Sequence, residues 1–174
     1  EFSRILMAWN IPGLKDQRKM IGFEILSSIL SVGRNSKLVK VLREEKNLVE
    51  SIYVDVNGGE LGSLLIIEAC CESKNLDLVE KQINEIISEI TSHKNLTPEE
   101  LTKAINIVKS NYVFNLETPT QISSFLGNEL LWGRKNSFKY IEIFLDYWKD
   151  LSNFREITNF LKEENFTLIA SPKL

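Results

Sequence analysis

The hydrophobic pattern of this 174-residue chain changes period along its length, and this change constrains the fold most strongly. Residues 51–56 (SIYVDV) alternate with period two, as a half-buried strand does. Residues 64–70 (LLIIEAC) are apolar on both faces, which indicates a central strand. The turn residues Asn57-Gly58-Gly59 lie between them, so the two segments predict an antiparallel pair.

Amphipathic helices are expected both before and after this pair of strands in the sequence. Apolar residues recur at helical spacing from Ile21 to Val32, after a capping residue at Asp16. Gly33 interrupts this helix before Leu38, Val39 and Leu42 resume the spacing. Four more helices are expected at 76–90, 120–132, 137–147 and 153–163. A fifth is expected to start at the capping-box sequence Thr97-Pro98-Glu99-Glu100.

Apolar strands are also expected near both ends of the chain. Residues 4–11 predict a buried strand that ends at Pro12-Gly13, and residues 166–170 predict a short strand that ends at Pro172. The resulting order is strand, two helices, two strands, several helices and a strand. It predicts an α+β fold with helices on one face of a mostly antiparallel sheet, and residues 1–174 are expected to form a single domain.

Charge and composition narrow the classes of function. The chain has 21 basic and 24 acidic residues and a net charge of −3, which does not suit a nucleic-acid-binding surface. No apolar run approaches the roughly 20 residues of a membrane span. Cys70 and Cys71 are adjacent, so a disulfide between them would be strained; we expect free thiols and a reducing compartment such as the cytoplasm. The chain starts without Met beside the apolar run 5–9, which suggests a piece of a longer polypeptide.

The chain lacks the residues of a hydrolytic metal centre. A catalytic zinc needs about three protein ligands, but the sole histidine is His93, in the polar segment 91–95, where a solvated loop position is expected. Neither HExxH nor HxxEH occurs, and there is no GxSxG sequence around a serine nucleophile. We therefore predict no catalytic residue and no metal ligand in this chain, and no peptide cleavage by the chain alone.

Two features suggest contacts with a partner or a peptide. Arg43 leads from a helix end towards a strand, where a guanidinium can meet a peptide carbonyl or carboxylate. The alternative is an ion pair with Glu44, Glu45 or Asp16. A set of aromatic residues at helical spacing is expected to lie mostly in the core, although some members could pack against a missing half. The set comprises Phe125, Trp132, Phe138, Tyr140, Phe144, Tyr147 and Trp148.

The order of several segments resembles the second, non-catalytic domain of the pitrilysin/insulinase zinc peptidases, a group that is similar to the mitochondrial processing peptidase subunits. The residues Gly33-Arg34-Asn35-Ser36-Lys37-Leu38, followed by Leu42-Arg43-Glu44-Glu45-Lys46-Asn47-Leu48, resemble the signature of that domain. Three further segments match it in order, and the resemblance covers nearly the whole chain. They are Leu96-Thr97-Pro98-Glu99-Glu100-Leu101, Glu117-Thr118-Pro119, and Gly127-Asn128-Glu129 before Leu131-Trp132-Gly133.

The resemblance implies a division of labour between two similar α+β halves that face each other around a chamber. One half carries an HxxEH zinc site, and the other closes the chamber and helps to hold the peptide. This chain, without HxxEH, resembles the second half. The implied partners are an HxxEH-bearing domain or subunit and a peptide substrate, and the implied zinc belongs to that partner.

The resemblance also implies two substrate-binding residues. Family members often carry an Arg/Tyr pair here; the Arg position matches Arg43, and the Tyr position is occupied by Glu50. An ionised carboxylate cannot donate a hydrogen bond as a phenol does, and it adds negative charge where an oxyanion would develop. Glu50 could instead pair with Arg43.

Two alternatives to a half of a zinc metalloendopeptidase stay open. One is an inactive structural subunit like the core proteins of respiratory complexes, which Glu50 at the Tyr position fits slightly better. The other is a general peptide- or protein-binding module.

Overall fold

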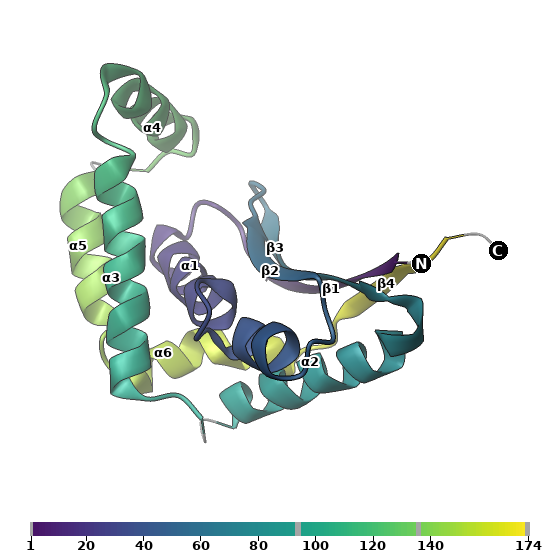
Figure 1. Cartoon of the computed structure of the whole chain (residues 1–174). Coiled ribbons are helices and arrows are strands. Elements are labelled where there is room, and N and C mark those ends of the chain that lie inside the picture. The colour runs from purple at the N-terminus through teal and green to yellow at the C-terminus, as the bar shows by residue number, and fades with distance from the viewer. Residues whose placement is uncertain (1, 93–94, 135–136, 173–174) are drawn as a thin grey trace.

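The computed structural model describes residues 2–92, 95–134 and 137–172, with the backbone alone at 137 and 138. Helices gather on one side of a twisted sheet, as Figure 1 shows. This arrangement confirms the predicted α+β class. His93 lies outside the described residues.

The described part of the sheet has four strands in the order β2-β3-β1-β4, and every neighbouring pair is antiparallel. Ile5 of β1 lies opposite Ala69 of β3 on one side and Ile169 of β4 on the other. The predicted pair of strands is therefore confirmed, with β3 in the interior of the sheet. The bounds are β1 (Phe2–Pro12), β2 (Ser51–Asn57), β3 (Gly62–Glu72) and β4 (Phe166–Ala170).

The helices begin where the capping residues predict. The Asp16 carboxylate accepts a hydrogen bond from the Lys19 N–H (3.1 Å) at the start of α1, and the Thr97–Glu100 capping box starts α3. The α-helices are α1 (Gln17–Ser31), α2 (Leu76–Thr91), α3 (Pro98–Phe114), α4 (Pro119–Leu131), α5 (Ser137–Tyr147) and α6 (Leu151–Thr158). Short 3-10 turns η2 (Ser73–Asn75) and η3 (Asn159–Lys162) precede α2 and follow α6.

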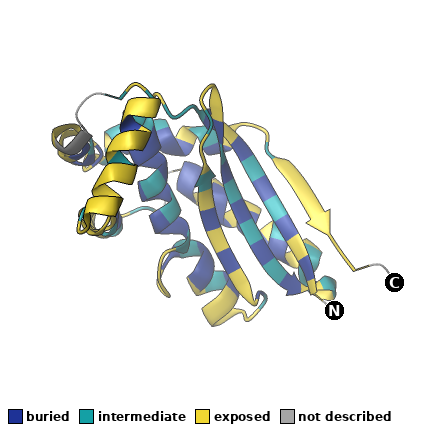
Figure 2. Cartoon of the chain, turned by 90° about the horizontal axis from the view of Figure 1, so that it is seen from above, coloured by how far each residue is buried: buried dark blue, intermediate teal, exposed yellow. Residues whose placement is uncertain are grey.

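The sheet buries one face only. Side chains that point towards the helices, such as Ile5, Met7 and Trp9 of β1, are fully buried and pack in a core with Phe23 and Phe154. In Figure 2 the opposite face lies open to the viewer. Residues in the middle of that face are half-buried, because neighbouring strands flank them and none of the described helices covers them. They include Leu6, Ala8, Leu64 and Ile66.

The segment that resumes helical spacing after Gly33 is wound differently from an α-helix. Residues Val39–Glu45 form a π-helical segment, η1. Its wide turns place the Lys46 N–H 3.0 Å from the Val41 carbonyl oxygen. Asn47 then adopts a positive φ of 49° and reverses the chain towards β2. Single π turns recur at functional sites, so this geometry draws attention to Arg43.

The cysteines follow expectation, but the aromatic set is less buried than predicted, and Trp132 is half-buried. Cys71 is buried, Cys70 is half-buried, and both are free thiols. Trp148 is fully buried, whereas Phe125 and Phe144 pack partly buried against the core. Tyr140 and Tyr147 are exposed, and the Phe138 side chain lies outside the described part. No described helix has the length and apolar character needed to cross a membrane.

Three strand ends meet at one corner of the molecule. The buried hydroxyl of Ser3 lies 2.8 Å from the Ser73 hydroxyl and 3.0 Å from the Ser171 hydroxyl. This contact joins the start of β1 to the residues that follow β3 and β4, so both ends of the described chain lie together at the β1–β4 edge (Figure 1).

Candidate functional site

Arg43 and Glu50 lie on either side of the turn that connects η1 to β2. Both are exposed. The guanidinium of Arg43 donates to Glu44 Oε1, with both Nε and Nη2 at 3.1 Å. The backbone N–H of Glu50 donates to the Cys70 carbonyl oxygen at 2.8 Å and extends the pairing of β2 with β3. Arg43 is thus paired with Glu44, one of the predicted alternatives, and a contact of either side chain with substrate stays a prediction.

The described residues do not provide a metal site. They contain no group of three or more His, Cys, Asp or Glu side chains placed to hold a metal ion. A zinc ion therefore does not fit the residues described.

The outer edge of β2 is closed by two hydroxyls of α1. Ser27 Oγ donates to the Val54 carbonyl oxygen at 2.7 Å, and Ser31 Oγ accepts from the Val54 N–H at 3.0 Å. An incoming strand would need these same backbone groups. Strand addition along β2 is therefore disfavoured at its centre.

The edge of β4 and the helix-free face of the sheet carry apolar side chains beside the Arg4–Glu68 ion pair. Phe166 is 71% exposed and Leu168 is 63% exposed. Their register places them beside Ala8 and Leu6 of β1, respectively. We call this area, with the half-buried Leu64 and Ile66 of β3, the open face. Apolar patches of this kind commonly mark interaction surfaces.

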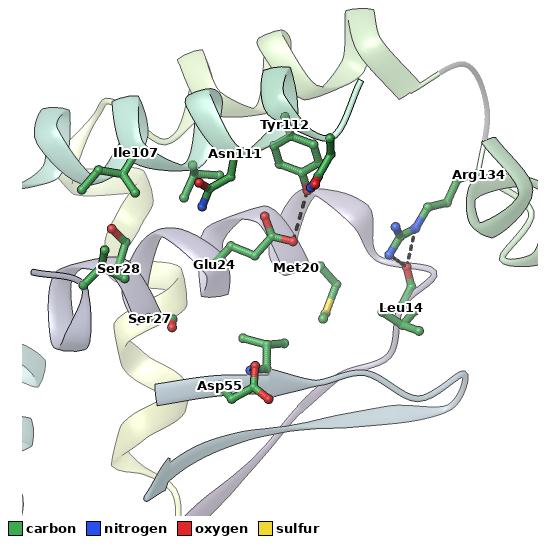
Figure 3. A pocket seen from close by; sticks show the side chains of 14 residues that line it. Leu14, Met20, Glu24, Ser27, Ser28, Asp55, Ile107, Asn111, Tyr112 and Arg134 are labelled. Atoms are coloured by element: carbon green, nitrogen blue, oxygen red, sulfur yellow. Dashed lines mark hydrogen bonds between the residues drawn. The ribbon is translucent and has the colours of Figure 1, made fainter. Parts of the chain in front are cut away.

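A pocket of about 410 Å³ lies between α1, α3 and β2, as Figure 3 shows. Glu24 projects from α1, and Asp55 projects from β2 on another wall. The hydroxyl of Tyr112 on α3 donates to Glu24 Oε1 at 3.1 Å. Asp55 also belongs to the exposed side of β2, so the pocket adjoins the open face.

Enclosure in this pocket shifts the proton affinity of Glu24. Burial of its carboxyl group raises the pKa of Glu24 to about 7, although the residue as a whole is only half-buried. The Tyr112 hydrogen bond and the positive charge of Arg134 act in the opposite direction, and the charge of Glu129 acts with burial. Burial, together with the nearby Glu24, raises the pKa of Tyr112 well above 10. The carboxyl of Glu24 is therefore about half ionised near neutral pH.

Arg134, at the rim of this pocket, is already neutralised. Its Nη1 donates to Glu129 Oε1 at 2.9 Å, and its Nε donates to the Leu14 carbonyl oxygen at 2.7 Å. Glu129 is buried and also accepts from Gln17 Nε2 at 3.0 Å. This ion pair connects the end of α4 to the loop before α1. Among the described residues, neither Glu24 nor Asp55 has an ion-pair partner.

One residue of the sequence carries a signal for this pocket. Glu24 stands alone in the apolar run Ile21-Gly22-Phe23-Glu24-Ile25-Leu26, where a carboxylate has to find a polar partner or change its pKa. Tyr112 continues the apolar helical spacing of Ile105 and Val108, so the sequence alone indicates a buried position for it and no partner. The contact between them joins residues 88 positions apart, which no local pattern reveals.

Solved structures of other proteins have a similar fold. A solved protease structure from Helicobacter pylori superimposes with a TM-score of 0.83 at 18% identity, over 98% of this chain and 41% of that one. A chain of complex III2 from Candida albicans superimposes with a TM-score of 0.78 at 15% identity, over 97% of this chain and 42% of that one. At such low identity these likenesses show the fold alone.

Sequence comparison identifies the family. An uncharacterized zinc protease of Streptomyces coelicolor is 27% identical over 130 residues, which are 73% of this chain and 28% of that protein. The chain thus spans under a third of that curated relative's length. The sequence model described as the peptidase M16 inactive domain matches residues 1–108, more than half of the chain. The chain therefore belongs to the family of peptidase M16 inactive domains.

Proposed function

We propose that this chain is the substrate-holding, chamber-closing half of a zinc-dependent metalloendopeptidase and supplies no catalytic residue itself. The observation that carries the proposal is its membership of the M16 inactive-domain family, together with the lack of a metal-ligand group among the described residues. The zinc, its HxxEH ligands and the activated water would come from a second half.

The open face is the surface proposed to meet that second half. It combines the exposed Phe166 and Leu168 with half-buried aliphatic residues, and contact with a partner would bury them. The length of the relatives supports such a partner, because this fold occupies 41% of the Helicobacter pylori chain. Both ends of the described chain also lie at the β1–β4 edge, so a second half fused at either end would start beside this face.

The substrate peptide is proposed to add to the sheet as an extended strand. Main-chain hydrogen bonds to an edge strand give affinity that tolerates many sequences. The Ser27 and Ser31 hydroxyls occupy the Val54 groups on the β2 edge, which favours β4 as the acceptor.

Arg43 is proposed to contact the peptide. Its guanidinium is exposed and its present partner, Glu44, is also at the surface, so exchange of that pair for a peptide carbonyl or carboxylate has a small cost. Glu50, in this proposal, faces the substrate without donating a hydrogen bond, and it does not support an oxyanion.

Reconstitution tests the proposal. The chain and the HxxEH-bearing half of its parent protein would be purified separately and mixed with a quenched fluorescent peptide. We expect cleavage that a chelator abolishes, and only when both halves are present. Chelator-sensitive cleavage by the 174-residue chain alone would refute the proposal.

The role of Arg43 has its own measurement in the same assay. Arg43→Ala should lower kcat/KM by about 10- to 100-fold, the effect of losing one charge-assisted hydrogen bond. Lys40→Ala is the control, because Lys40 is an exposed cation of the same segment. If the pair that contains Arg43→Ala cleaved the peptide with the same kcat/KM as the unaltered pair, contact between Arg43 and the peptide would be excluded.

An inactive structural subunit is the second candidate function. The likeness to a chain of complex III2 and the glutamate at position 50 favour it. Under this alternative, the two halves would bind each other tightly and the mixture would cleave no peptide. Measurement of complex formation in the same mixtures separates the two functions.

A further inference from the structure

We propose that the pocket between α1, α3 and β2 binds an organic cation on an aliphatic stem, namely the side chain of a lysine or arginine in a bound peptide. The proposal of a cation site is based on the geometry of this chain alone. Its assignment to a peptide rests on the proposed function.

The charges of the pocket favour a cation. Glu24 and Asp55 lie on two walls and have no ion-pair partner among the described residues. Arg134 is the only cation among the described lining residues, and Glu129 and the Leu14 carbonyl oxygen already engage it. The titratable groups near Glu24 are Tyr112, Arg134 and Glu129, with Asp55 across the pocket. The balance of these charges is negative once Glu24 ionises.

A buried hydroxyl without a partner in the same pocket indicates that a ligand completes it. The hydroxyl of Ser28 is fully buried and has no hydrogen-bond partner in the described structure, and Ser28 lines the pocket. The exposed side chain of Asn111 also lines the pocket, where its amide is open to solvent and to a ligand. Buried polar atoms are normally paired. Hydrogen bonds to a ligand, or to water that moves with it, would supply the partners.

The remaining lining suits an aliphatic stem. Met20, Val32, Val56, Ile107 and Val108 provide apolar surface beside the polar groups. Lysine and arginine place their methylene groups along such surface and keep the charged end among polar partners. The pocket adjoins the open face at Asp55, on the β2 edge and opposite the β4 edge, so the side chain that it takes belongs to a part of the peptide beyond the strand added at β4.

Because the cation is expected to pair with the ionised Glu24 carboxylate, its binding should depend on pH. The pKa of Glu24 is about 7, so its ionised fraction rises as the pH passes from 6 to 8. If the cation needs the ionised carboxylate, its affinity should increase by up to about tenfold over this range. A neutral ligand would not show this increase.

Titration of the chain, followed by NMR, tests the proposal. The probe is a blocked pentapeptide of four alanines around a central lysine, and the matched control has norleucine in place of lysine. We expect the lysine peptide to shift the resonances of Glu24, Ser28, Asp55 and Asn111, with at least fivefold tighter binding than the norleucine peptide. Glu24→Gln keeps an oxygen for the Tyr112 hydroxyl and should weaken the lysine peptide at least fivefold, and Asp55→Asn should also weaken it.

The controls make each outcome decisive. Glu163→Gln removes an exposed carboxylate elsewhere and should change nothing. The cation site would be overturned if the two peptides bound with equal affinity. It would also be overturned if neither Glu24→Gln nor Asp55→Asn changed the affinity for the lysine peptide. Butylamine that binds as tightly as the lysine peptide would overturn the assignment to a peptide side chain. The titration uses the chain alone, so its result does not depend on whether a reconstituted pair cleaves peptides.

Discussion

Gly22 of α1 lies directly against Ile157 of α6: a Cβ atom at position 22 would come within 2.6 Å of Ile157 Cδ1 and Cγ1. Ile157 is fully buried, so it has no room to move away. Gly22→Ala should therefore destabilise the fold by about 1–2 kcal/mol, because overpacking outweighs the gain in helix propensity. Urea unfolding measures the change.

Gly127 of α4 provides the opposite case. No heavy atom lies within 4 Å of a Cβ built at this position. Gly127→Ala should raise the free energy of unfolding by about 0.5–1 kcal/mol through helix propensity and the less flexible unfolded chain. A loss of stability here would show that α4 makes contacts the described structure lacks.

The pair Glu24–Tyr112 predicts how stability depends on pH. The pKa of Glu24 is about 7 in the folded chain, above its ordinary value of 4.5. A raised folded pKa means that the stabilising contribution is full below the unfolded value and is lost as the pH rises through the folded value. The free energy of unfolding should thus fall by roughly 2 kcal/mol between pH 5 and pH 8, relative to Glu24→Gln. If the free energy of unfolding changed with pH in the same way for the unaltered chain and for Glu24→Gln, the raised pKa of Glu24 would be contradicted.

The two hydroxyls that bind Val54 predict the behaviour of the β2 edge. Replacing Ser27 and Ser31 by alanine leaves the Val54 N–H and carbonyl without these partners. The double variant should lose about 1–3 kcal/mol and self-associate more readily, because an unblocked edge pairs with another copy. Ser110→Ala removes an exposed hydroxyl bound within α3 and is the matched control. Sedimentation velocity should show larger species only in the double variant.

The capping box of α3 predicts a simple stability difference. The Thr97 hydroxyl accepts from the Glu100 N–H at 3.2 Å, and the Glu100 carboxylate accepts from the Thr97 N–H at 3.0 Å. Thr97→Ala should cost about 1 kcal/mol, the usual effect of removing an N-cap. Thr102→Ala, one turn later on the exposed side, should stay within about 0.5 kcal/mol of the unaltered chain. Thermal unfolding of both variants distinguishes a cap from an ordinary surface threonine.

Local chemistry made most of the fold predictable from the sequence. Asp16 and Thr97 cap helices because their side chains meet nearby N–H groups, and these contacts need no tertiary structure. Period-two and helical spacings located strands and helices for the same reason. The π winding of Val39–Glu45 was missed, since its apolar spacing resembles that of an α-helix.

Contacts across long sequence distances were not predictable. Arg134 reaches the Leu14 carbonyl oxygen across 120 positions, and the pocket exists only once α3 packs on α1. The substrate-contact role of Arg43 and Glu50 came from a family resemblance and stays a prediction. The structure adds to it only the pair that Arg43 forms with Glu44.

The junction of Ser3 with Ser171 has a consequence for rearranging the chain. Because the two hydroxyls are 3.0 Å apart, a short glycine-rich linker could join the end that follows β4 to the start of β1. New termini could then be cut at the exposed Gly58 or Glu60 in the β2–β3 turn. Such a circular permutant should keep the native sheet and present its ends on the hairpin tip, so a fused module would be attached at that tip and not at the β1–β4 corner.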